Sequence, residues 1–211
     1  MIQTFLNLPE STIINKSLPK SAIYQKFAMS SSEQIYFDKD ISRVYIASLI
    51  SPETFNLKTG KNIQQFYILQ VQLKTKDYTE KNIIKLTKLI PQNMIFALEH
   101  ENLLQLAVVY KTDSSTKFIH TDWKDFKTAE LILTGLDLDS VYENCIRQIA
   151  LEPFQHETQQ TLQESLEKTE HKKKLQKKIC ALQNKIRKEK QFNIQVELKG
   201  QLRKLEAELN E

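Results

Sequence analysis

Two series of aliphatic side chains near the C-terminus recur with steps of four, three and four residues. The first series is Leu175, Ile179, Leu182 and Ile186, and the second is Leu198, Leu202, Leu205 and Leu209. This spacing places the members of each series on one side of an α-helix and is typical of a coiled coil. We therefore predict a helical tail in which these eight side chains form a packing surface for a protein partner, for a second copy of the chain or for each other.

The two series are out of phase, because Leu198 lies twelve residues after Ile186 rather than eleven or fourteen. Either one long helix carries a phase shift near residues 190–193, or the chain folds back there into an antiparallel hairpin. We favour the hairpin slightly, although neither Gly nor Pro marks a turn. Gly200 lies within the second series and is expected to weaken that helix by about 1 kcal/mol relative to Ala.

Composition changes at Phe154. Of the aromatic residues, 17 lie at or before Phe154, and so do all five prolines. Residues 1–154 carry no net charge, so the formal +4 of the chain belongs to the tail. A segment almost without aromatic residues builds no sizeable core alone. We predict an α+β globular domain at residues 1–154 and a helical coiled-coil tail at residues 155–211, either a hairpin or one long helix.

The pattern within residues 1–154 predicts an α+β fold with a mostly antiparallel sheet and flanking helices. Runs of β-branched and aromatic residues predict strands at residues 43–50, 65–74, 94–98, 104–111, 117–121 and 131–133. Helical spacing predicts a helix that starts near Ser17-Leu18-Pro19 and further helices at residues 32–38, 79–90 and 139–150. The expected N-caps are Thr79 for the third helix and Asp139 or Ser140 for the fourth.

Several functional classes are excluded by what the sequence lacks. It contains no apolar run of about 18 residues and no basic leader, which predicts a cytoplasmic protein that does not enter a membrane. Its three glycines are too few and too scattered for a phosphate-binding loop. The four histidines are isolated, and Cys145 and Cys180 form no metal-binding pair. We predict no cofactor, no metal site and no catalytic residue.

One weak nuclease signal stands against that prediction. Gln72-Leu73-Lys74 ends a predicted strand, and a carboxylate from Asp38, Asp40 or Glu53 would complete part of a metal-dependent nuclease site. A strand that simply ends in a solvated lysine explains the same residues. The nuclease is therefore the least favoured function.

A basic run lies between His171 and Lys190. It holds nine basic residues against the single acidic residue Glu189, and acidic stretches flank it on both sides. Such a run neutralises backbone phosphates without reading sequence, although it is also the pattern of a solvated coiled-coil face. The candidate nucleic-acid-binding residues are Lys172, Lys173, Lys174, Lys177, Lys178, Lys185, Arg187, Lys188 and Lys190.

Several segments together resemble a prokaryotic family, domain-of-unknown-function family 4391. They are Leu8–Thr12 with Asn15-Lys16 and Pro19-Lys20, Ile50–Thr54 with Asn56, Leu89-Ile90-Pro91, Leu136–Ile149 and Glu189–Leu198. The resemblance covers nearly the whole chain. It implies a gene context beside helicase and DNA-methyltransferase genes of restriction or phage-defence type. It supplies no catalytic residues.

These observations predict a non-catalytic accessory subunit of a helicase- or restriction-type phage-defence complex. The α+β domain and the coiled-coil tail would dock on a protein partner, or the tail would form a homodimer. The alternative is a module that binds DNA or RNA through the basic tail without sequence preference.

Overall fold

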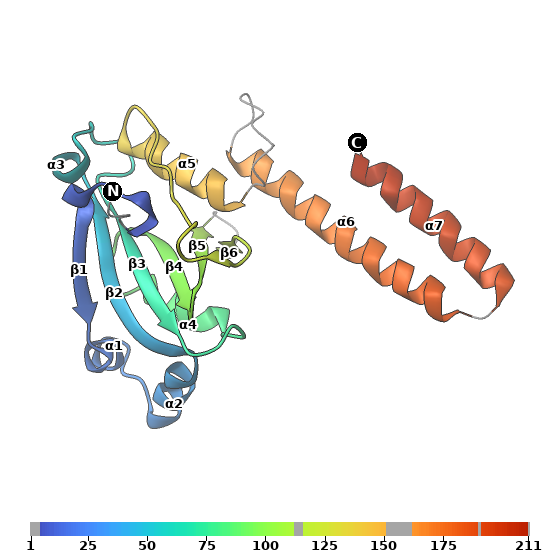
Figure 1. Cartoon of the computed structure of the whole chain (residues 1–211), viewed down its shortest axis with the longest axis horizontal. Helices are drawn as coiled ribbons and strands as arrows, with labels where there is room; N and C mark the ends of the chain where they lie inside the picture. Colours follow the sequence, from blue (N-terminus) through green and yellow to red (C-terminus); the bar gives the residue numbers. More distant parts are fainter. Residues whose placement is uncertain (1–4, 112–115, 151–161, 190, 211) are drawn as a thin grey trace. The chain divides into compact units, whose positions relative to one another are not determined.

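The computed structural model describes residues 5–111, 116–150, 162–189 and 191–210. The chain divides into two compact units, Met1–Pro153 and Phe154–Glu211. The first unit contains a sheet with helices, and the second contains two long helices (Figure 1). No helix in the described ranges is long and apolar enough to cross a membrane.

The sheet of the first unit has seven strands in its described part. They are β1 (Ile13–Leu18), β2 (Ile41–Ile50), β3 (Phe66–Leu73), β4 (Asn93–His100), β5 (Leu103–Lys111), β6 (Thr116–His120) and β7 (Lys124–Asp125). The first six lie side by side in chain order, and β7 also pairs with β5. Every pair is antiparallel except β3 and β4. The predicted mixture of helices with a mostly antiparallel sheet is therefore confirmed.

The first unit also contains five α-helices among its described residues. They are α1 (Lys20–Lys26), α2 (Ser31–Asp40), α3 (Pro52–Phe55), α4 (Glu80–Leu86) and α5 (Leu138–Ala150), and two 3₁₀ turns (Phe5–Asn7 and Glu10–Thr12) precede β1. Helix α2 begins with a capping box, in which Ser30 accepts from the Glu33 amide and Glu33 accepts from the Ser30 amide. Helix α4 makes the parallel connection between β3 and β4.

One face of the sheet carries the main apolar core. Alternate residues of β3 (Leu69, Val71 and Leu73) belong to one buried cluster with Ile23 of α1 and Phe37 of α2. Ile83 and Leu86 of α4 join the same cluster. The period of two along β3 thus matches the face that α1, α2 and α4 cover.

Helix α5 covers part of the other face. Phe66 of β3 contacts Tyr142 of α5, with ring centroids 5.1 Å apart. Val141, Cys145 and Ile149 are buried, as their helical spacing predicted. Burial raises the pKa of the Cys145 thiol to about 12, so this thiol stays protonated and unreactive at neutral pH.

Asp40 joins three elements at one end of the sheet. Its carbonyl oxygen accepts from the Lys74 amide at 2.8 Å, which ties the start of β2 to the end of β3. Its carboxylate accepts from the Thr79 amide and from the Asn82 side chain, both at 2.8 Å. Thr79 is the N-cap of α4 but its hydroxyl makes no capping bond. The buried carboxylate of Asp40 instead holds the start of α4 through the Thr79 amide and the Asn82 side chain.

Two local predictions were wrong and one strand was missed. The helix expected to start near Ser17-Leu18-Pro19 begins at Lys20, but Ser17 and Leu18 end β1, an edge strand whose largely exposed side chains give no apolar alternation. Residues 131–133 form no strand, because the Gln148 side chain bonds both the amide and the carbonyl of Ile132. Helix α5 is capped by Asp137, which accepts from the Ser140 amide at 2.9 Å, whereas Asp139 accepts from the amides of residues 61–63.

The second unit consists of α6 (Leu162–Lys188) and α7 (Phe192–Asn210), which fold back on one another as a hairpin (Figure 1). Leu175 and Ile179 are 4% and 7% exposed, the lowest values among the described side chains of this unit. Leu182, Ile186, Leu198, Leu202 and Leu205 are half-buried, and the side chain of Leu209 lies outside the described part. The two aliphatic series thus supply the packing between α6 and α7.

Replacing Asp40 by Ala is expected to lower the free energy of unfolding by about 2–4 kcal/mol, because two donors lose a buried charged acceptor. Chemical denaturation followed by circular dichroism measures this loss. Asp122→Ala, at an exposed site, is the control and should change stability by less than about 0.5 kcal/mol. An Asp40→Ala protein as stable as this control would contradict the role given to Asp40.

Gly60 and Gly200 are expected to respond differently to substitution by Ala. A Cβ on Gly200 meets nothing within 4 Å, so Gly200→Ala should stabilise α7 by about 1 kcal/mol. A Cβ on Gly60 overlaps the Asp139 carboxylate and lies 2.7 Å from the Asp139 amide, so Gly60→Ala should destabilise the first unit. Thermal unfolding monitored at 222 nm compares the two variants. Equal effects would contradict this assignment.

Candidate nucleic-acid interface

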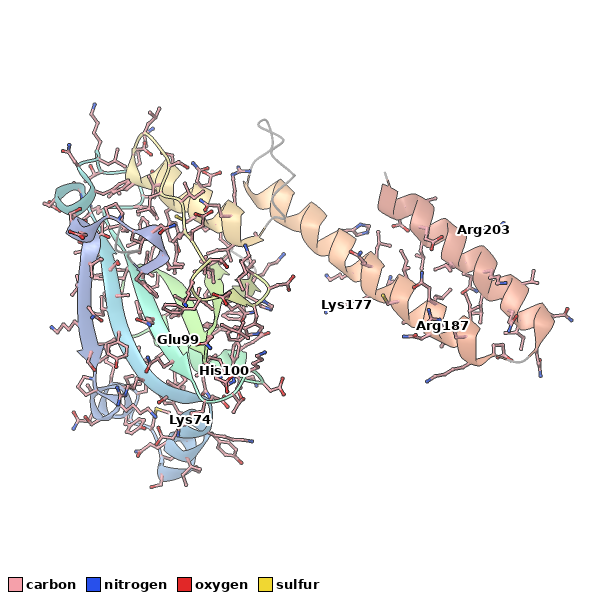
Figure 2. The ribbon with its side chains drawn as sticks, viewed as in Figure 1. Lys74, Glu99, His100, Lys177, Arg187 and Arg203 are labelled. Atoms are coloured by element: carbon pink, nitrogen blue, oxygen red, sulfur yellow. The ribbon has the colours of Figure 1, made fainter. Side chains whose placement is uncertain are left out.

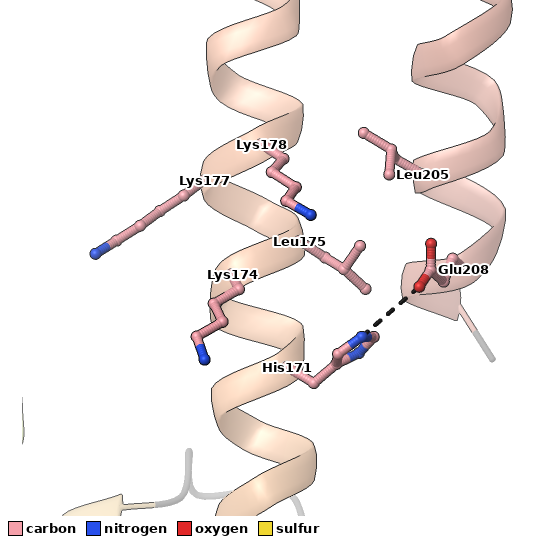
Figure 3. Close-up of a pocket in the computed structure, with 7 residues that line it drawn as sticks. All are labelled: His171, Lys174, Leu175, Lys177, Lys178, Leu205 and Glu208. Atoms are coloured by element: carbon pink, nitrogen blue, oxygen red, sulfur yellow. Dashed lines mark ion pairs between the residues drawn. The ribbon is translucent and has the colours of Figure 1, made fainter. Parts of the chain in front are cut away.

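The pairing of α6 with α7 fixes which side chains share a side of the hairpin. Leu175 of α6 faces Leu205 of α7 (Figure 3). One turn nearer the N-terminus of α6, His171 Nε2 lies 3.7 Å from Glu208 Oε1. Because residue numbers rise along one helix as they fall along the other, these two contacts define the antiparallel register. They also show that His171 and Glu208 lie on the same side of the packed surface.

Five lysines of α6 share one flank of the helix. Each residue advances about 100° around a helix of 3.6 residues per turn, so these five side chains fall within an arc of about 100°. All five are exposed, and they extend over about 21 Å of helix at 1.5 Å per residue. This lysine flank consists of Lys174, Lys177, Lys178, Lys185 and Lys188. Its centre is about 120° from the series that packs on α7.

The far flank of α6 is nearly uncharged in its described part. Gln176, Cys180 and Gln183 occupy it, together with the single cation Arg187. Arg203 of α7 also lies away from the lysine flank, because it is about 140° around α7 from Glu208. Lys177, Arg187 and Arg203 are marked in Figure 2. Among the described side chains of α6, the positive charge is therefore gathered mainly on one side.

A hollow of about 320 Å³ opens beside the lysine flank. Lys174, Lys177, Lys178 and His171 line it, with Glu208 as the one carboxylate (Figure 3). The Leu175 and Leu205 side chains complete its lining. This combination suits an anionic group that rests on the surface, because the cations outnumber the carboxylate and remain in contact with solvent.

The sequence candidates are distributed as follows. Six basic candidates (Lys174, Lys177, Lys178, Lys185, Arg187 and Lys188) are exposed on α6. The side chains of Lys172, Lys173 and Lys190 lie outside the described part. The partner-binding candidates of both aliphatic series face the seam within the hairpin, except Leu209, whose side chain is not described. Sequence reasoning missed Lys204, which the fold-back brings to the side of the lysine flank, because the position of the turn was open.

A second polar cluster lies at the carboxyl ends of the parallel strands β3 and β4. Lys74, Glu99 and His100 are labelled there in Figure 2. The Glu99 carboxylate accepts from the side-chain amides of Gln70 at 2.6 Å and Gln72 at 3.4 Å. Carboxyl ends of parallel strands are common ligand sites in open sheets. Here the side-chain amides of Gln70 and Gln72 already donate to one oxygen of Glu99. These hydrogen bonds link β3 to β4.

The residues of the nuclease hypothesis are only partly brought together. Asp40 lies beside Lys74, but its carboxylate is buried and bonded to α4. Asp38 bonds Lys20 and Tyr24, each at 2.5 Å. Glu53 follows the opposite end of β2. Within the described ranges, no group of three or more His, Cys, Asp or Glu residues is able to hold a metal ion.

Asp38 and Tyr24 form a tie between α1 and α2. Partial burial opposes ionisation of Asp38, but hydrogen bonds from Lys20 and Tyr24 and the charges of Lys20 and Lys74 outweigh it and lower its pKa. Burial and the same carboxylate raise the pKa of Tyr24 to about 12. At neutral pH the pair is a carboxylate bonded by a neutral phenol, which is a structural contact rather than an acid-base couple poised for catalysis.

The comparison with protein families identifies the chain. The model of the family described as Domain of unknown function (DUF4391) matches residues 6–209. The chain belongs to this family. The match confirms the resemblance seen in the sequence segments and covers both units. No curated protein and no solved structure matches the chain.

Proposed function

We propose that this protein is a non-catalytic binding protein whose helical hairpin holds the sugar–phosphate backbone of a nucleic acid. The observation that carries the proposal is the lysine flank of α6, where five exposed cations lie within one arc over about 21 Å. Phosphates attract such a row because binding releases the counterions condensed on the nucleic acid.

The chemistry of the flank favours binding without sequence preference. Base edges are read by bidentate side chains, mainly Arg, Asn and Gln. The flank presents lysines, which act as point charges on long flexible stems. It is therefore suited to phosphates rather than to bases.

The proposal includes an antiparallel coiled coil between α6 and α7. The steps of four, three and four in both series support it, as does the His171–Glu208 contact beside the Leu175–Leu205 pair. In this arrangement the seam residues pack on each other within the chain. The lysine flank takes no part in this packing.

A second candidate is an accessory subunit that docks on a helicase or restriction-type protein in the cytoplasm. The observation that favours it is a pair of adjacent apolar side chains on α2, Ile35 and Tyr36, each 70% exposed. Large exposed hydrophobic side chains beside one another are common at docking surfaces. The docking surface on the first unit and the lysine flank on the second are compatible in one protein.

Removing two charges from the lysine flank is expected to weaken nucleic-acid binding. For Lys178→Gln/Lys185→Gln, affinity for a labelled 20-bp duplex should fall about tenfold, and the slope of log affinity against log salt should decrease by about 2. Fluorescence anisotropy with the full chain at several salt concentrations between 50 and 200 mM measures both quantities, which reflect about two lost phosphate contacts.

The matched control is Arg187→Gln/Arg203→Gln, which removes the same charge away from the lysine flank. Its affinity should stay within about twofold of the original protein. Equal losses in both double variants would contradict the proposal, because overall charge would then explain the binding.

Introducing charge at Ile35 and Tyr36 is expected to abolish docking on a protein partner. Ile35→Glu/Tyr36→Glu would bury two carboxylates in an apolar contact, which is strongly unfavourable. Co-purification of the tagged protein with helicase or restriction-type subunits co-expressed from neighbouring genes measures this. Lys39→Glu, an exposed change on the same helix with the same change in net charge, is the control and should co-purify normally. Co-purification by both variants would refute this docking surface.

A further inference from the structure

We infer that the nucleic acid held by the hairpin is double-helical DNA, and that the lysine flank spans one groove with a group of lysines on each bordering strand. This inference rests on the proposed function and specifies its ligand. Three features of the described hairpin support it: the grouping of the lysines, the residue between the groups and the lack of stacking side chains.

The lysine flank is divided into two groups along the helix. Lys174, Lys177 and Lys178 form the first group, and Lys185 and Lys188 form the second. The gap from Lys178 to Lys185 is about 10 Å, and the centres of the groups are about 15 Å apart. The major groove of B-form DNA is about 12 Å wide. Lysine stems easily cover the remaining difference, so each group reaches the phosphates on its own side of the groove.

The residue between the two groups is Ala181. It falls on the same arc as the lysines, about 20° from Lys174, and it is exposed. Of the described side chains on this flank between Lys178 and Lys185, it is the one nearest to the centre, and it carries neither charge nor hydrogen-bonding group. If phosphates lay along the whole flank, a cation would be favoured at this position. At the opening of a groove no phosphate lies opposite, so a cation there gains nothing.

The sequence of the hairpin is poor in the side chains with which proteins hold single strands. Proteins that bind single strands without sequence preference combine a basic groove with several aromatic side chains on which bases stack. Phe192 is the one aromatic residue in the sequence after Phe154. Apart from the hollow beside Lys174, Lys177 and Lys178, the lysine flank is a straight ridge on a helix. It is suited to a regular duplex, whose phosphates keep fixed spacings.

The neighbouring helix restricts the contact to the ridge of α6. The register places Glu197, Gln201, Lys204 and Glu208 of α7 on the same side of the hairpin as the lysine flank. With two carboxylates and one lysine, this side of α7 carries a net negative charge and repels the phosphates of a nucleic acid. The duplex therefore rests on α6, and its groove is crossed by that one helix.

Moving one lysine while conserving charge tests the spacing. In Ala181→Lys/Lys185→Gln, the flank keeps five lysines but the gap is filled and the second group is halved. Affinity for a 20-bp DNA duplex is expected to fall about fivefold, since a phosphate contact across the groove is lost. Ala→Lys and Lys→Gln both preserve helix propensity, so unchanged circular dichroism is expected.

Three further probes define the ligand, each measured by anisotropy with the full chain. A single strand of the same sequence and a duplex RNA, whose A-form grooves have other widths, should each bind at least about fivefold more weakly than the DNA duplex. Poly-glutamate at equal charge concentration should not displace the DNA. Displacement by poly-glutamate would overturn the inference in favour of an acidic protein ligand.

The outcomes separate the inference from the proposed function. Equal binding of single strand and duplex, or full affinity of Ala181→Lys/Lys185→Gln, overturns the groove-spanning inference while the proposed function stands. Unchanged duplex affinity in Lys178→Gln/Lys185→Gln overturns the proposed function itself. Selective loss of duplex binding in both double variants, with Arg187→Gln/Arg203→Gln unaffected, supports both.

Discussion

The buried carboxylate of Asp40 is the constraint on which the first unit is organised. It lies where β2 begins, β3 ends and α4 starts, and it satisfies donors from the start of α4. Without a local acceptor, the first amides of a helix are left unbonded as the chain leaves a sheet. Asp40 supplies an acceptor for the Thr79 amide at the start of α4, the helix that connects β3 to the parallel strand β4. The apolar cluster lies between the sheet and helices α1, α2 and α4.

In the second unit the corresponding constraint is apolar. The two aliphatic series satisfy each other across the hairpin, so the side chains that first suggested an external partner are mainly occupied within the chain. The same packing orients α6, and with it the five lysines of one flank. Hairpin packing and the proposed ligand binding thus use different faces of one helix, so substitutions on the lysine flank leave the packing of the two series undisturbed.

Much of the fold was predictable because buried strands carry a strong local pattern. The alternation in β3, the apolar runs of β4 and β5 and the spacing of Val141, Cys145 and Ile149 in α5 were all read correctly. The edge strand β1 was missed because a strand with exposed side chains has no such pattern. Residues 131–133 were misread because the strand-like run is held by the Gln148 side chain instead of a neighbouring strand. The nuclease hypothesis weakened for a similar reason, since the bonding of Asp38 and Asp40 depends on helices remote in sequence.

The sequence by itself determined the neutral, aromatic-rich first unit, the helical character of the tail and the concentration of positive charge between His171 and Lys190. These properties depend on composition and on residue spacing, which are local. The tertiary structure decided that α6 and α7 form a hairpin, which side of α6 faces α7 and therefore which lysines remain together on one exposed flank. That choice depends on the contact between two helices whose relative register no local pattern specifies, because both series keep the same spacing in one long helix and in a hairpin.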